Sequence, residues 1–135
     1  MSRLLIIPAR GGSKRIPGKN MYQFGGRPAL HLTIELALSS ELFDLIVVSS
    51  DDDEILASVS DYPVMSDSKR PGKFSNDHAT VTEVLKYEVR KLAKRNLYFN
   101  EVWQMSSFAF LLSCSDLEKF ALQARDIPKD GLLIG

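Results

Sequence analysis

The sequence predicts an α/β fold in which a mostly parallel sheet is covered by helices on both faces, giving three layers. Two short apolar runs, residues 4–7 (LLII) and 45–48 (LIVV), have the length and composition of strands buried on both faces. Stretches with helical spacing of apolar residues alternate with these and later strand-like runs. Such alternation requires right-handed crossovers, so residues 1–135 are expected to form one domain that binds ligands beyond the carboxyl ends of its strands.

The elements of the first half follow from local patterns. Residues 29–38 have helical spacing and are expected to form a helix that stops near Ser39 and Ser40. After the strand at 45–48, Asp51 and Glu54 have the spacing of a capping box, which predicts a short helix over residues 55–59. Residues 63–65 are expected to form a brief third strand.

The second half begins with a loop over residues 66–78, which are rich in Pro, Gly, Ser, Asn and Asp. Apolar residues then recur at helical spacing and predict a helix; they are Val81, Val84, Leu85, Val89 and Leu92. Residues 101–107 are expected to form a fourth strand, a capped helix is expected to start at Ser115, and residues 132–134 are expected to begin a fifth strand.

Composition and charge exclude several classes of protein. Hydrophobic residues make up 44% of the 135 residues and charged residues 25%, which are ordinary values for a globular protein. The 17 basic and 17 acidic side chains cancel, so no global field favours nucleic acid or an anionic membrane. No apolar run approaches the roughly 20 residues that span a bilayer, and no signal peptide precedes the first strand, so a cytoplasmic protein is expected. The single cysteine, Cys114, cannot form an internal disulfide.

The loop after the first strand concentrates positive charge and glycine. Its cations and glycines all lie within residues 10–19 and are Arg10, Lys14, Arg15, Lys19, Gly11, Gly12 and Gly18. Glycine lets backbone N–H groups approach an anion, and the cations provide charge where a polyphosphate would lie. The Walker A spacing is absent, because Gly12 and Gly18 are separated by five residues and no hydroxyl residue follows Lys19. The loop is therefore predicted to bind phosphates; the alternative is a solvated basic turn that caps a helix.

Residues 8–20, with the sequence PARGGSKRIPGKN, resemble the motif of the cytidylyltransferases that activate acidic nine-carbon sugars. These enzymes are the CMP-sialic acid synthetases and their pseudaminate and legionaminate relatives; enzymes that activate the eight-carbon sugar Kdo carry a similar but less closely matching loop. The resemblance implies a Rossmann-like nucleotidyltransferase sheet and transfer of CMP from CTP to an acidic nonulosonic sugar, with release of pyrophosphate and Mg²⁺ as the cofactor. The expected partners are thus CTP and an acidic sugar, with no nucleic acid and no membrane.

Within this loop, Arg10 and Lys19 are the predicted catalytic residues. Arg10 follows the strand and can hold non-bridging oxygens in a bidentate manner, whereas Lys19 is a point charge suited to the α-phosphate. The remaining substrate-binding residues predicted in the loop are Gly11, Gly12, Ser13, Lys14, Arg15 and Asn20. Asn20 carries both a donor and an acceptor, which suits the polar edge of cytosine or the ribose. Lys14 has the alternative of facing solvent.

A second stretch, Arg70-Pro71 followed by residues 74–77 (FSND), also resembles a family motif. The resemblance implies that Arg70 contacts cytosine. Asp77 is predicted either to bind substrate or only to cap the following helix. The acidic residues at 51–53 suggest a metal site, but such runs more often cap a helix, so a structural role is favoured and the metal ligands remain unassigned.

The third motif region departs from the family. Gln104 fits the glutamine of the turn that contacts the acceptor sugar, but the prolines are missing and Phe108 and Phe110 replace small polar residues. The family's dimerisation element and Mg²⁺-binding acids have no counterpart here, so weak or absent synthetase activity is expected, and the uncovered strand at 132–134 predicts a homo-oligomer. Two alternatives are a truncated homologue that binds nucleotide or a partner without catalysis, and a nucleotidyltransferase for another sugar such as Kdo.

Overall fold

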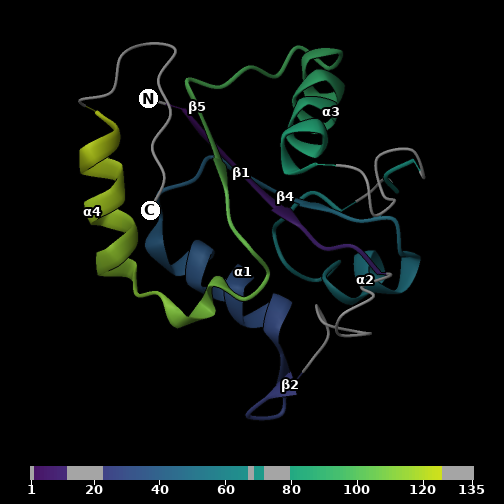
Figure 1. The fold of residues 1–135 in the computed structure, drawn as a ribbon, viewed down its shortest axis with the longest axis vertical. Coiled ribbons are helices and arrows are strands. Elements are labelled where there is room, and N and C mark those ends of the chain that lie inside the picture. Colours follow the sequence, from purple (N-terminus) through teal and green to yellow (C-terminus); the bar gives the residue numbers. More distant parts are fainter. Residues whose placement is uncertain (1, 12–22, 67–68, 72–79, 126–135) are drawn as a thin grey trace.

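The structure is a computed structural model that describes residues 2–11, 23–66, 69–71 and 80–125. Its main sheet consists of β1 (Arg3–Pro8), β4 (Leu45–Ser49) and β5 (Glu101–Gln104), all parallel, in the order β4-β1-β5 (Figure 1). The apolar run of β1 is completely buried between its two neighbours. The predicted α/β fold with a parallel sheet is confirmed, whereas the strand expected at residues 132–134 lies outside the described residues.

Helices cover both faces of this sheet. On one face, α1 (Ala29–Ser40), α2 (Asp53–Ser58) and α4 (Cys114–Ala124) pack on a large core that includes Leu5 and Ile7. On the other face, α3 (Val81–Ala93) packs on a smaller core that contains Leu4 and Ile6 (Figure 1). Alternate residues of one buried strand therefore serve the two cores, as the pleat of a strand requires.

The register brings the carboxyl ends of the strands to one edge. Pro8 pairs with Ser49 of β4, and Ile6 pairs with Gln104 of β5. The brief third strand expected at residues 63–65 is reduced to one parallel bridge, between Val47 and Met65. Two hydrogen bonds hold this bridge, from Met65 N–H to the Ile46 carbonyl at 2.8 Å and from Val48 N–H to the Met65 carbonyl at 3.0 Å.

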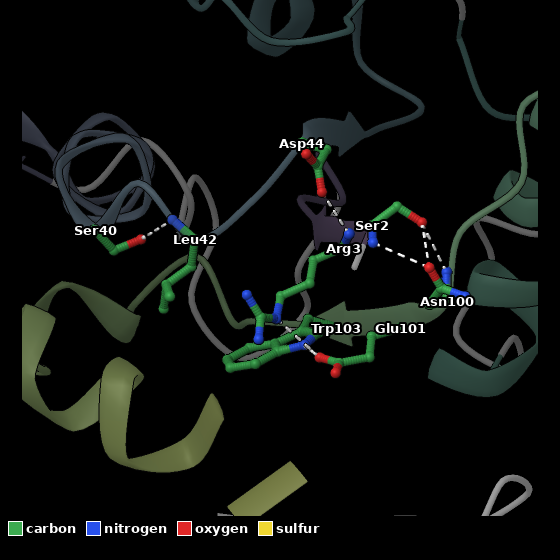
Figure 2. A network of polar contacts seen from close by, with 8 residues as sticks. All are labelled: Ser2, Arg3, Ser40, Leu42, Asp44, Asn100, Glu101 and Trp103. Carbon is green, nitrogen blue, oxygen red and sulfur yellow. Dashed lines mark hydrogen bonds and ion pairs between the residues drawn. The ribbon is translucent and has the colours of Figure 1, made fainter. Parts of the chain in front are cut away.

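The amino edge of the sheet is held by a separate polar network, which Figure 2 shows from close by. Arg3 N–H donates to Oδ2 of Asp44 at 2.7 Å, while Arg3 Nε and Trp103 Nε1 both donate to Oε1 of Glu101, at 3.0 and 2.9 Å. Next to these strands, Ser2 N–H donates a hydrogen bond of 3.0 Å to Oδ1 of Asn100, which joins the residue before β1 to the residue before β5. Together with the apolar core, these contacts fix the register that aligns the opposite, carboxyl edge.

The cap of α2 differs from the one that the sequence predicts. Asp52, and not Asp51, is the N-cap, and its Oδ1 accepts a hydrogen bond of 2.8 Å from Glu54 N–H. The expected capping box of Asp51 with Glu54 is therefore wrong, because the helix starts two residues earlier, at Asp53. Asp51 is left available for a contact with the loop after β1.

The last strand and helix also differ in their bounds. β5 ends at Gln104 and does not continue to residue 107, because the chain turns at Ser106, whose carbonyl accepts from Ala109 N–H at 3.0 Å. The turn leads into the short 3₁₀ helix η3 (Ala109–Leu111). The N-cap of α4 is Ser113, which forms a capping box with Asp116, so the helix begins at Cys114 and not at Ser115.

A two-stranded hairpin precedes α1. Its strands are β2 (Gln23–Phe24) and β3 (Arg27–Pro28), and the turn between them has positive φ at Gly25 (61°) and Gly26 (82°), a conformation that glycine adopts without strain. The ring of Phe24 lies 5.0 Å from that of Phe110, between centroids, so the hairpin packs on η3. In the described part of the chain, no helix is long and apolar enough to cross a bilayer.

Candidate functional site

Two loops meet where β1 and β4 end. Ala9 N–H donates to the Ser49 carbonyl at 2.8 Å, which extends the pairing of the two strands by one residue. Gly11 N–H then donates to Oδ1 of Asp51 at 2.9 Å. The start of the glycine-rich basic loop is therefore fixed against the loop that leads into α2.

Glycine is required at position 11 because the two loops approach closely. A Cβ atom built on Gly11 would lie 2.5 Å from Oδ2 and 2.7 Å from Cβ of Asp52. Real side chains do not tolerate contacts this short, and Asp52 is held in place by its role as the cap of α2. The first glycine of the loop thus leaves room for the side chain of Asp52.

Arg70 reaches the same edge from a distant part of the sequence. Its backbone N–H donates to the Ser50 carbonyl at 2.7 Å, and its Nη1 donates to Oγ of Ser49 at 3.1 Å. The residue is only 3% exposed. The Arg70 side chain is therefore buried at the end of β4 and bound there to Ser49.

The electrostatics of Arg70 show which charged groups surround it. Burial lowers the pKa of the Arg70 guanidinium, and the positive charge of Arg10 lowers it further, while the carboxylates of Asp51 and Glu88 raise it. The charges of the two arginines thus repel each other, and the two acids act in the opposite direction and more strongly than Arg10 does. Paired guanidinium groups with several donors each are suited to binding phosphate or another polar anionic group.

The acidic residues 51–53 have separate structural contacts. Asp51 accepts from Gly11, Asp52 caps α2, and Asp53 is exposed and lies 3.6 Å from Nζ of Lys69. Among the residues that the structure describes, no group of three or more His, Cys, Asp or Glu side chains is arranged to hold a metal ion. These contacts agree with the structural role that the sequence favours for the run.

The structure describes four of the predicted site residues and places them along one edge. Arg10 and Gly11 follow β1, Arg70 is bound to the end of β4, and the exposed Gln104 ends β5. The other predicted site residues lie outside the described residues: Gly12, Ser13, Lys14, Arg15, Lys19, Asn20 and Asp77. Their roles stay predictions.

Sequence reasoning missed two residues that contact Arg70 directly or through one hydrogen bond. Ser49 accepts from Arg70 and donates to Oε1 of Glu88 at 2.8 Å, although Glu88 belongs to α3. A signal for Glu88 exists in the sequence, because it lies four residues from both Val84 and Leu92 and so shares their buried stripe.

A parallel α/β sheet with a glycine-rich basic loop after its first strand, and with arginines gathered at the carboxyl edge, defines a class of nucleotide-binding proteins. Within that class, the family model for cytidylyltransferases matches residues 4–100. The chain belongs to the cytidylyltransferase family.

Curated relatives narrow the resemblance to enzymes of acidic sugars. The chain is 41% identical over 113 residues to a pseudaminic acid cytidylyltransferase of Campylobacter jejuni. The matched stretch covers 84% of this chain and 49% of that protein. It is 37% identical over 106 residues to a CMP-N,N'-diacetyllegionaminic acid synthase of Legionella pneumophila, covering 76% and 44%. The chain thus spans about half the length of these relatives.

Solved structures share the fold. The structure of CMP:2-keto-3-deoxy-manno-octonic acid synthetase complexed with CTP superposes with a TM-score of 0.76 at 24% identity, covering 93% of this chain and 48% of that one. A cytidylyltransferase from Leptospira borgpetersenii has a TM-score of 0.68 at 19% identity, covering 91% and 48%. The agreement confirms the three-layer nucleotidyltransferase-type fold expected from the sequence.

Proposed function

We propose that this chain binds CTP at the carboxyl edge of its sheet and serves the transfer of CMP from CTP to an acidic nonulosonic sugar, with release of pyrophosphate. The observation that carries this proposal is the placement of Arg10 and Arg70 at the ends of β1 and β4, with Gly11 held at the start of the basic loop. The family and the relatives, which include pseudaminic and legionaminic acid enzymes, support the choice of nucleotide and acceptor class.

The chemistry assigns distinct roles to the two arginines. Arg10 leads into the basic loop, where a triphosphate would lie, and its guanidinium offsets the charge on non-bridging oxygens as pyrophosphate leaves. Arg70 donates toward the acceptors O2 and N3 of cytosine; uracil carries a hydrogen on N3 and would present it to a group that can only donate. Lys19 is proposed as the second catalytic cation, acting on the α-phosphate.

Several parts of the function rest on the family resemblance. Mg²⁺ is proposed as the cofactor that offsets triphosphate charge, but the described residues supply no ligand set for it, so no step is assigned through it. Gln104 is proposed to contact the acceptor sugar from the end of β5. A cytoplasmic location and a homo-oligomer are proposed as well.

Pyrophosphate release tests this function. The chain is incubated with CTP, Mg²⁺ and, in separate reactions, pseudaminic, legionaminic and N-acetylneuraminic acid, and with Kdo as the alternative acceptor. Formation of a CMP-sugar with a nine-carbon acid supports the proposal, and a clear preference for Kdo would reassign the acceptor. CTP binding without pyrophosphate release would support the alternative of a nucleotide-binding chain without turnover.

A further inference from the structure

A buried carboxylate from α3 reaches the sheet edge beneath the proposed nucleotide site. Glu88 is 1% exposed, although its side chain is ionisable, and it lies on the same helical stripe as the apolar Val84 and Leu92. Burying an ionised carboxylate costs several kcal/mol unless partners offset it. Its burial therefore calls for a role beyond packing.

The partners of Glu88 form a directed chain of hydrogen bonds. Ser49 Oγ donates its only proton to Oε1 of Glu88 at 2.8 Å, so its lone pairs remain for an incoming donor. Nη1 of Arg70 is that donor, at 3.1 Å from Oγ, and it also lies 3.3 Å from the Ser49 carbonyl. The carboxylate thus fixes the orientation of the hydroxyl, and the hydroxyl accepts from the guanidinium.

The second oxygen of Glu88 is arranged differently. Nζ of Lys91 lies 3.1 Å from Oε2, one turn along α3, but the contact lacks hydrogen-bond geometry, and Oε2 has no hydrogen-bond partner among the described atoms. Lys91 is partly exposed, whereas the Ser49 side of Glu88 is enclosed. The well-formed contact of Glu88 is therefore the one that leads to Arg70.

We infer that Glu88, acting through Ser49, is a positioning residue that fixes the guanidinium of Arg70 at the carboxyl edge of the sheet and so sets the preference for CTP over UTP. The preference rests on the base contact assigned to Arg70 in the proposed function, but the positioning itself does not. Glu88 touches no substrate in this arrangement. It makes the base-reading group rigid before the ligand arrives, which reduces the ordering cost of binding.

Guanidinium NMR of the full chain tests the positioning without any nucleotide. The Arg70 Nε–Hε signal is identified by its loss in Arg70→Lys, and rotation about the Nε–Cζ bond is then measured in Ser49→Ala and Glu88→Gln. We expect rotation to become faster on the order of tenfold in Ser49→Ala, as expected for loss of one charge-assisted hydrogen bond, and to become faster in Glu88→Gln. Ser40→Ala, at the amino edge, and Glu118→Gln, on the exposed surface of α4, are the matched controls and should change nothing.

Nucleotide binding supplies the second readout. Calorimetry should show that Ser49→Ala narrows the ratio of CTP to UTP affinity by roughly tenfold, while affinity for pyrophosphate is retained. Unchanged Arg70 rotation in both variants overturns the inference, whatever the nucleotide result. Faster rotation with an unchanged CTP to UTP ratio supports the positioning and contradicts the base contact of Arg70. If Glu88→Gln does not fold, Ser49→Ala alone decides, because it removes one oxygen and keeps the carboxylate.

Discussion

The backbone N–H of Gly11 donates a hydrogen bond of 2.9 Å to Oδ1 of Asp51, across 40 positions of sequence. This bond ties the start of the basic loop to the loop between β4 and α2. It also gives Asp51 a structural task at the same edge where its charge favours the protonated guanidinium of Arg70. One carboxylate therefore links the backbone geometry of the loop to the electrostatics of the proposed site.

Replacing Asp51 tests this link. Asp51→Ala should lower the free energy of unfolding by about 1–3 kcal/mol, because it leaves the Gly11 N–H without its partner and Arg70 without one of its compensating charges. Asp53→Ala is the matched control; its exposed ion pair with Lys69 should contribute about 0.5 kcal/mol or less. Urea unfolding measures both. Stabilisation of the wild-type chain by Mg²⁺ alone, lost in Asp51→Ala, would instead indicate a metal site.

The close approach at Gly11 predicts a coupling with Asp52. Gly11→Ala should destabilise the fold by about 1–3 kcal/mol, since the new methyl group would lie 2.7 Å from Cβ of Asp52. In an Asp52→Gly background that Cβ is absent, so the same substitution should cost much less. A double-mutant cycle measures the difference by urea unfolding. If Gly11→Ala destabilises both backgrounds equally, the contact with Cβ of Asp52 is not the cause of the destabilisation.

The caps of α4 provide a local test of the structure. Ser113→Ala should lower the free energy of unfolding by about 1 kcal/mol, because the Ser113 side chain accepts from Asp116 N–H at 3.1 Å. Ser115→Ala, two residues along, should have an effect of at most about 0.5 kcal/mol. Thermal unfolding compares the two variants. A larger effect at Ser115 would restore the helix start that the sequence first suggested.

Stability should depend on pH through His31. Burial lowers the pKa of His31, with Arg27 acting in the same direction and Glu35 opposing it, so between the lowered value and the ordinary 6.5 the unfolded chain binds more protons than the folded one. Stability should therefore rise as pH increases through that window. His31→Gln should reduce this slope, measured by urea unfolding from pH 5 to 7.5. Glu35, whose pKa the hydrogen bond from Tyr62 lowers, titrates below 4.5 and supplies the comparison at lower pH. An identical slope in His31→Gln would remove His31 as the cause.

The buried strands were predictable because their signal is local. A short continuous apolar run such as residues 4–7 is typical of a strand that is buried on both faces of a sheet. The alternation of such strands with helices leaves few topologies open. The bounds of the later elements were not predictable from local patterns. The chain leaves β5 for a turn in which the Ser106 carbonyl accepts a hydrogen bond from Ala109 N–H. Helix caps failed for a similar reason, because Asp51 and Asp52, or Ser113 and Ser115, offer the same side-chain chemistry and only the three-dimensional contacts choose between them.

The position of some candidate site residues at one edge of the sheet was predictable, whereas their roles stay predictions. Motif resemblance identified Arg10, Gly11 and Arg70, and the register of the sheet brings them to one edge. The contacts of Asp51 and Glu88 were not predicted, because they join segments about 20 to 40 residues apart. Val81 and Val89 belong to the apolar pattern that predicts the helix α3, yet they are 49% and 37% exposed. The buried stripe of α3 consists of Val84, Glu88 and Leu92. A hydropathy pattern assigns a glutamate such as Glu88 to the solvent-exposed face of a helix.

CTP binding by calorimetry, with the 135-residue chain and its Arg10→Ala and Lys19→Ala variants, tests the proposed nucleotide site most directly. Each substitution should weaken CTP binding on the order of 10- to 100-fold without loss of folding, because each removes a charge-assisted contact with phosphate. Arg90→Ala, on the exposed face of α3, is the control and should bind CTP like the wild type. Unchanged CTP affinity in both Arg10→Ala and Lys19→Ala would contradict the assignment of the basic loop as the triphosphate site.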